Sequence, residues 1–213
     1  MRRPLIALLP VLLATSAEAQ IGRRGGLQFS QPDSWVSFGA ALQNGFTVHD
    51  GTTGSRWDFG DATMYTVSLE RALSNGASIG LRGNTGSVPL TYTDATIGST
   101  DADANISQLF LSLYLTSGQS FHTVLEGDLG GTLYSNFRQR STGARLGPAN
   151  PDADFAFVLG YGAGYSFSPR FSVDFVQTVT TSLHQKTGLS AGDDSSVRVG
   201  ATRLVARFGL GGH

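Results

Sequence analysis

The sequence predicts an all-β protein, an eight-stranded antiparallel up-and-down transmembrane β-barrel. Three observations lead to this prediction: an N-terminal export signal, eight segments in which large apolar residues alternate with small or polar ones, and connections that alternate between short and long. Residues 154–167, DFAFVLGYGAGYSF, show the alternation most clearly. A period of two is typical of a strand that has one apolar face.

The first nineteen residues have the pattern of a secretory signal peptide. Arg2 and Arg3 precede an apolar run, and Ala17-Glu18-Ala19 fits a cleavage site. The apolar run is too short for a spanning helix, which takes roughly 20 residues. We therefore expect a signal peptide over residues 1–19, cleavage after Ala19, a short polar lead-in over residues 20–33 and a barrel over residues 34–213.

Eight strands are expected from the alternation of apolar and polar residues. Several are longer than the roughly five or six residues of a globular strand and reach the roughly 9–11 residues of a membrane strand. The expected strands cover residues 34–43, 57–73, 77–90, 105–116, 121–135, 154–167, 170–182 and 196–210.

The connections between these segments sort by length. Tight turns rich in Gly, Ser, Asn and Pro are expected at residues 74–76, 117–120 and 168–170. Long polar loops are expected at residues 44–56, 91–104, 136–153 and 183–195. Because strands alternate in direction, the tight turns should lie at one end of the barrel, the short-turn end, and the loops at the other, the long-loop end.

Composition indicates which way the apolar face points. Charged residues make up 15% of the chain, below the roughly 25% of ordinary soluble domains, and Lys186 is the only lysine. A polar face in contact with water would carry many Lys and Glu, as in the alternative of a secreted soluble lipocalin-like barrel that binds an apolar ligand. The small and polar residues found here favour a narrow lumen, with the apolar face toward lipid.

The absence of cysteine excludes disulfides and thiolate metal sites. The formal net charge of -1 gives no indication of nucleic-acid binding.

A charge network is expected inside the lumen, because isolated buried charges are costly and need partners. It comprises the charged residues on the polar faces of the strands: Glu70, Arg82, Glu126, Asp128, Asp174, Arg203 and Arg207.

Two aromatic girdles are expected where the barrel wall crosses the membrane surfaces. The one near the long-loop end would contain Trp57, Phe59, Phe155 and Phe157, and the one near the short-turn end Phe121, Phe167, Phe171 and Phe208.

With its signal peptide, eight alternating segments and three tight turns, the sequence resembles the small eight-stranded outer-membrane barrels of the OmpA transmembrane-domain and OmpX type. The resemblance implies an integral protein of a Gram-negative outer membrane, with tight turns in the periplasm and long loops outside. It implies membrane lipids, lipopolysaccharide and the outer-membrane assembly machinery as partners, besides an unknown extracellular partner of the loops. Such barrels usually end on an aromatic residue, whereas this chain ends in RFGLGGH.

We expect a non-enzymatic barrel with a structural or surface-interaction role through its loops, and at most a narrow pore. The alternative is an enzyme that modifies lipid A, with Ser182 and His184 as a nucleophile and base at the rim. No acidic residue is clearly placed by the sequence to orient His184, and the strand phase turns both residues toward the lumen.

No cofactor or metal site is expected. The four histidines are scattered, which disfavours a zinc site. Residues 101–105, DADAN, begin like a calcium loop, but Ile106 stands where that loop needs glycine.

Overall fold

Eight strands form a closed ring in the residues that the structure describes, confirming the predicted fold class. The structure is a computed structural model and describes residues 32–51, 53–74, 76–184 and 196–212, so the predicted signal peptide and most of the lead-in lie outside it. The strands are β1 (Ser34–Gln43), β2 (Phe46–Asp50), β3 (Ser55–Phe59), β4 (Ala62–Ser74), β5 (Ala77–Asp94), β6 (Gly98–Gly118), β7 (Phe121–Gln139), β8 (Asp152–Ser168), β9 (Phe171–Leu183) and β10 (Val197–Leu210).

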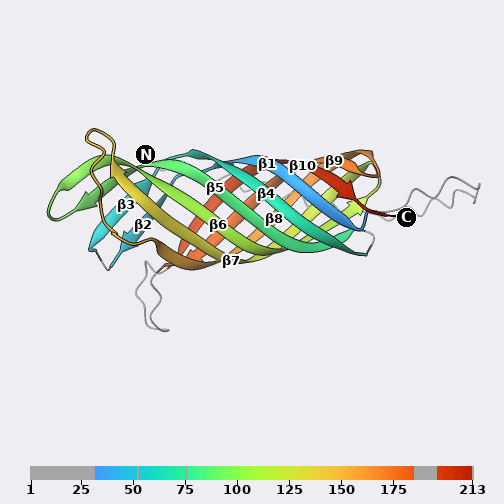
Figure 1. Cartoon of the computed structure of the whole chain (residues 1–213), viewed down its shortest axis with the longest axis horizontal. Helices are drawn as coiled ribbons and strands as arrows, with labels where there is room; N and C mark the ends of the chain where they lie inside the picture. Colours follow the sequence, from blue (N-terminus) through green and yellow to red (C-terminus); the bar gives the residue numbers. More distant parts are fainter. Residues whose placement is uncertain (1–31, 52, 75, 185–195, 213) are drawn as a thin grey trace, which may run out of the picture.

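The ring runs β1-β4-β5-β6-β7-β8-β9-β10, and an antiparallel pairing between β1 and β10 returns to its start. β5 and β6 pair without a break from Ala77↔Leu115 to Asp94↔Gly98. The remaining strands, β2 and β3, form a hairpin that continues β1 and β4 beyond the ring, where β3 pairs with the outer part of β5 (Figure 1). Within the described residues, no helix is long and apolar enough to cross a membrane.

The strands extend further than the sequence predicts at the long-loop end. Residues 91–94 and 98–104, expected as loop, belong to β5 and β6. Residues 46–50, also expected as loop, form β2, and β7 continues to Gln139. Polar residues in these stretches face water while alternating with buried ones, so they keep the strand period but lose the apolar outer face from which the strands were recognised. Most of the expected loop 183–195 lies outside the described residues.

The expected strand 57–73 is two strands, because the chain changes face between Phe59 and Ala62. In β4 the inward residues are even-numbered, such as Thr66 and Glu70, whereas in β3 the odd-numbered residues point inward. The neighbouring β1 and β2 change face in the same way across Asn44-Gly45. Backbone groups at the break stay bonded, since the Gly60 amide donates to the Pro89 carbonyl (2.8 Å) and the Gly45 amide to Asp61 Oδ1 (2.7 Å).

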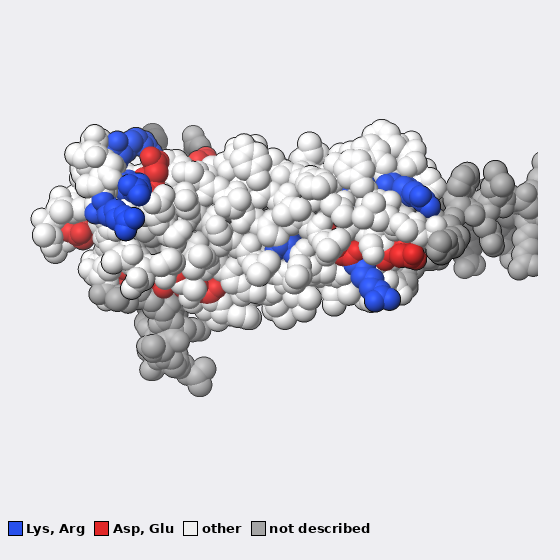
Figure 2. Space-filling model, in the orientation of Figure 1, with Lys and Arg blue, Asp and Glu red and all other residues white. Residues whose placement is uncertain are grey.

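The outer surface carries a broad apolar band. Large apolar side chains are exposed from the short-turn end up to the level of Leu42, Leu109, Leu133, Phe155 and Val179. Beyond that level the exposed positions of the strands are mostly polar. Charged residues gather toward the two ends of the molecule and leave most of the middle of the visible face uncharged (Figure 2). An apolar belt between polar ends is the surface of a barrel that spans a bilayer.

Aromatic residues gather on the outer surface at the short-turn end. Phe121, Phe167 and Phe208 are exposed, and Phe171 lies between the last two with ring centroids 5.4 and 5.0 Å apart. At the other edge of the band Phe155 is exposed and Phe157 half-buried. Trp57 and Phe59, however, are buried inside, so assigning them to the outer girdle was wrong. The change of face between Phe59 and Ala62 is the reason.

The lipid-facing role of the band predicts the effect of a charge within it. Leu111 is 52% exposed and pairs with Leu81 and Leu129, both also exposed. Leu111→Arg should lower the free energy of unfolding in lipid vesicles by about 2–4 kcal/mol, measured by urea titration, because arginine near the bilayer midplane is poorly solvated. Ile97, 50% exposed at the tip of the β5–β6 hairpin, provides the matched control. Ile97→Arg should have little effect, and equal losses in the two variants would contradict a membrane position for the band.

Candidate functional site in the barrel interior

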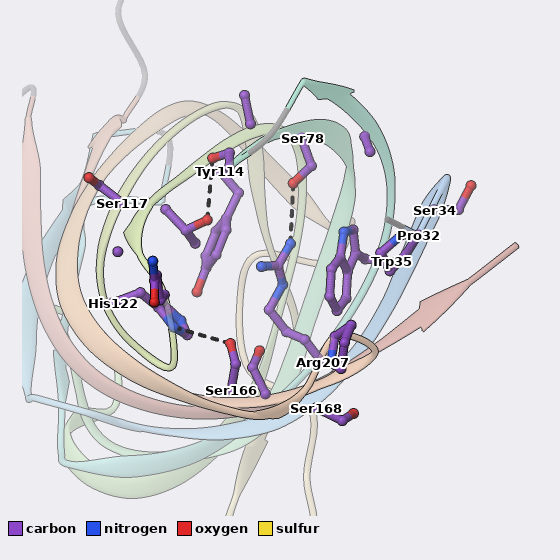
Figure 3. Close-up of a pocket in the computed structure, with 18 of the residues that line it drawn as sticks. Pro32, Ser34, Trp35, Ser78, Tyr114, Ser117, His122, Ser166, Ser168 and Arg207 are labelled. Atoms are coloured by element: carbon purple, nitrogen blue, oxygen red, sulfur yellow. Dashed lines mark hydrogen bonds between the residues drawn. The ribbon is translucent and has the colours of Figure 1, made fainter. Parts of the chain in front are cut away.

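Inward side chains form three layers along the barrel. The first layer, at the short-turn end, surrounds an open vestibule of about 1330 Å³. Trp35, Tyr114, His122 and Arg207 lie around its inner part, and Ser166 lies beside His122 (Figure 3). These residues come from β1, β6, β7, β10 and β8. The vestibule is therefore a feature of the closed ring, because segments far apart in sequence build it.

Arg207 lies at the inner end of the vestibule. Its guanidinium packs over the rings of Trp35 (4.8 Å to the centroid) and Tyr114 (4.1 Å), and it forms an ion pair with Glu70. The Glu70 carboxylate also accepts hydrogen bonds from Ser68 (2.7 Å) and Ser78 (2.6 Å). Both charges are buried, so these contacts replace the water that the groups lose.

Asp174 holds a second buried cluster. Tyr114 Oη donates to its carboxylate at 2.6 Å, and His122 Nε2 lies 2.9 Å from its other oxygen. Glycine at position 164 makes room for this pair, since a Cβ there would lie 2.1 Å from Asp174 Oδ1 and 2.5 Å from His122 Nε2 and would force both side chains to move. The sequence could not assign this role to Gly164, because the register between β8 and β9 sets it.

A hydroxyl, an imidazole and a carboxylate lie next to one another here, from Ser166 through His122 to Asp174. The Ser166 Oγ to His122 Nδ1 distance is 3.4 Å, at the long limit of a hydrogen bond, and Tyr114 already occupies the second oxygen of Asp174. The geometry therefore fits a tether for Tyr114 and His122 better than an activated nucleophile.

The middle layer is a network of buried ion pairs. Arg82 pairs with Glu126 and Asp128, and Arg203 pairs with the second oxygen of Glu126. Each of the four residues is at most 5% exposed. A cavity of about 10 Å³ remains between this network and Glu70, room for about one water molecule. Buried charges in direct ion pairs are strongly coupled, and removal of one leaves its partner uncompensated.

The structure places all seven residues of the expected charge network inside the barrel. Six of them form ion pairs between arginine and carboxylate, in two groups around Glu70 and Glu126. Asp174 differs, since its partners are Tyr114 and His122. The sequence pairs neither residue with Asp174, and only their position on inward faces, opposite an inward acid, could have indicated this contact.

The third layer, at the long-loop end, is apolar and rich in aromatic residues. Trp57 lies 4.6 Å from Phe137 and 5.8 Å from Tyr134, and Phe59 lies 5.9 Å from Tyr134, measured between ring centroids. Phe137 points inward because β7 is irregular at Asn136, which has a positive φ of 57° and shifts the phase of the strand. Val48, Val88 and Ile106 belong to the same core.

Ser182 and His184 both lie within this layer and are 2% exposed. His184 Nδ1 contacts Asp154 Oδ2 at 3.0 Å and lies 3.7 Å from Asp152 Oδ2. An acidic residue thus orients His184, which the sequence did not reveal, because the β8–β9 register brings positions 154 and 184 together. The Ser182 hydroxyl lies 3.4 Å from Thr132 Oγ1. Both side chains are thus buried in the barrel interior and are not exposed at its rim.

The charges around His184 shift the titration of this cluster, which lies beyond the apolar band. Burial acts to lower the pKa of His184, but the hydrogen bond to Asp154 and the nearby carboxylate charges outweigh it and raise that pKa. Burial and the neighbouring carboxylates raise the pKa of Asp152, against the opposing effect of His184. The neighbouring carboxylates thus contribute to both shifts, whereas burial raises the pKa of Asp152 and opposes the rise of the His184 pKa.

The calcium-like segment 101–105 forms part of β6. Asp103 forms an exposed ion pair with Arg140 at 2.7 Å, and Ala102 and Ala104 point into the core. The alternating directions of a strand keep these residues from surrounding one ion.

No protein-family model matches the chain, and no curated protein matches it. Among solved structures, Neisserial surface protein A aligns with a TM-score of 0.54 at 12% identity, over 85% of this chain and all of that one. The outer membrane proteins AlkL (TM-score 0.48, 16% identity, 92% of this chain and 98% of that chain) and OprG of Pseudomonas aeruginosa (0.47, 13%, 84% and 94%) also align. The chain has the fold of a small integral outer-membrane β-barrel.

The middle layer predicts a large cost for an isolated substitution. Glu126→Gln removes the one ion-pair partner of Arg203 within the described residues and one of the two partners of Arg82. Breaking a buried pair from one side costs about 3–5 kcal/mol, so the urea midpoint of unfolding should fall sharply. Asp103→Asn, which breaks the exposed pair with Arg140, should change it far less. Similar effects would mean that the interior charges are well solvated.

Proposed function

We propose that the protein is an integral outer-membrane barrel whose lumen is closed to solutes, and that it acts through the surface presented by its long-loop end. The observation that supports this best is the filling of the lumen at two successive levels. The ion-pair layer leaves a cavity of about 10 Å³, and aromatic side chains fill the next layer out. The vestibule ends at the first of these, so it is a dead end within the described part of the chain.

The long-loop end offers a preformed surface for a structural or binding role. β5 and β6 remain paired up to Asp94↔Gly98, and the β2–β3 hairpin is paired to β5. Hydrogen-bonded hairpins lose little conformational entropy on binding, which favours recognition by a rigid surface. Burial of Ser182 and His184 supports a non-enzymatic role, with lipid A modification as the less favoured alternative.

Lipopolysaccharide is the partner that the charges of this surface favour. Arg138 and Arg145 form a bridge pair across the β7–β8 connection, so two exposed like charges lie opposite each other. The Arg138 guanidinium donates to Asn136 and to the Gly143 carbonyl, and among the described residues neither arginine forms an ion pair. Paired like charges are unfavourable alone but suit a phosphate group, which accepts several guanidinium hydrogen bonds.

Conductance tests whether the barrel is closed. Purified protein in planar lipid bilayers should show no steady ion current, because the two filled layers block any water path. Fractionation of cells should place the protein in the detergent-extracted membrane fraction. A stable ohmic current would rule out a closed lumen, and recovery of the protein in the soluble periplasmic fraction would rule out the membrane assignment.

Binding of labelled lipopolysaccharide tests the partner. The double variant Arg138→Gln, Arg145→Gln should bind several-fold more weakly, with the difference shrinking as salt is raised. Arg140→Gln serves as the matched control, because Arg140 is already paired with Asp103 on the same side of the barrel. If the control loses as much affinity as the double variant, Arg138 and Arg145 have no specific role.

A further inference from the structure

Four titratable side chains converge at the long-loop end. Asp50 comes from β2, Asp152 and Asp154 from the start of β8, and His184 directly follows β9. One potential ligand atom from each of Asp50, Asp152 and His184 lies within 4.8 Å of the others. The convergence depends on the closed ring and its hairpin, since the residues span more than half of the chain.

Among the described residues, Asp152 and Asp154 have only one positively charged side chain beside them. Asp50 and His184 are 2% exposed and Asp154 is 4% exposed, and the ring of Trp57 lies 5.5 Å from that of His184. In the described part of the chain, His184 is the only cationic partner of Asp152 and Asp154. Asp152 and Asp154 therefore share one imidazole beside an aromatic wall, and a bound cation would neutralise their remaining negative charge.

The imidazole is oriented as in a metal-binding histidine. Asp154 holds Nδ1 at 3.0 Å, and Nε2 is buried without a hydrogen-bond partner among the described residues. Asp152 Oδ2, 3.7 Å from Nδ1, is likewise buried and without one. Histidines that bind metals commonly donate their second ring N–H to a carboxylate, which fixes the ring and raises its basicity.

We propose that Asp50, Asp152 and His184 form a binding site for a divalent transition-metal ion of the Zn²⁺ type, with Asp154 as the residue that positions the imidazole. One imidazole nitrogen and two carboxylates suit Zn²⁺, which accepts nitrogen and oxygen ligands in a tetrahedral site, with a fourth position for water or a further ligand. Ca²⁺ and Mg²⁺ prefer oxygen-only sites, so the imidazole selects against them.

A bound ion would connect parts of the outer end that the sheet leaves separate. In the described residues, β2 pairs only with β3, whereas Asp152 and His184 belong to the β8–β9 side of the ring. Coordination would join the β2–β3 hairpin to that side and neutralise the charge at the edge of the aromatic core. The site has a structural purpose, independent of whether the lumen conducts.

The test is a Zn²⁺ titration of refolded, metal-free protein in detergent micelles, in competition with a chromophoric chelator. Wild type should bind one Zn²⁺ per chain, with a rise in the thermal midpoint. His184→Gln and Asp152→Asn should each weaken binding at least about tenfold, and Asp154→Asn about 10–100-fold. His49→Gln is the matched control, because His49 is exposed on the same hairpin as Asp50, and it should bind like wild type.

Heat-modifiable migration on gels identifies variants that fail to fold. We expect Asp152→Asn to be tolerated best, because the Asp152 side chain is 25% exposed. Quenching of Trp57 fluorescence by Cu²⁺ gives a second reading of position, since the ring is close to His184. Absence of one-to-one Zn²⁺ binding in wild type would overturn the proposal. So would unchanged affinity in folded Asp152→Asn, or tighter binding of Ca²⁺ than of Zn²⁺.

Discussion

The backbone has no hydrogen-bonding partner in the hydrocarbon of a bilayer, and every other feature of this protein depends on that constraint. A spanning sheet must therefore close on itself. The β1–β10 pairing completes the ring, and each of its eight strands is bonded on both sides among the described residues. A ring of this size leaves an interior that side chains can fill. Glycines on the inner faces and buried ion pairs follow from the limited space.

The polar interior also determines which face of each strand points inward. A shift of one residue would exchange the two faces of a strand, and it would place Glu126 or Arg82 against lipid. The ion pairs join strands that are not neighbours in the sheet, since Glu70 on β4 reaches Arg207 on β10 and Arg82 on β5 reaches β7. In other proteins apolar residues can replace buried ion pairs without loss of stability, but apolar residues here would remove the contrast between the two faces of each strand.

The sequence was sufficient for the ring and for the inward position of the charges, because period two and residue type determine both. Prediction from the alternation failed where a break in a strand changed which positions face inward. A period of two over residues 57–73 places Trp57 and Phe59 on the outer face with Leu69, and the break at Gly60-Asp61 turns them inward. The extension of β5 and β6 past Pro89 was hidden because their outer residues there are polar. The contact between Asp154 and His184 depends on the register Phe155↔Leu183, which no local pattern contains.

The changes of face near Asn44-Gly45 and Gly60-Asp61 have a consequence for how the molecule sits in its membrane. On the bilayer side of these breaks apolar side chains face outward and polar side chains face the lumen. Beyond the breaks apolar side chains fill the interior and polar ones face outward, as in a water-soluble barrel. The position of the membrane surface along the barrel is thus set by fixed residues of the chain. A bilayer of different thickness must become thinner or thicker around the barrel, or the barrel must tilt. The reason is that the protein matches lipid and water at only one depth in the membrane.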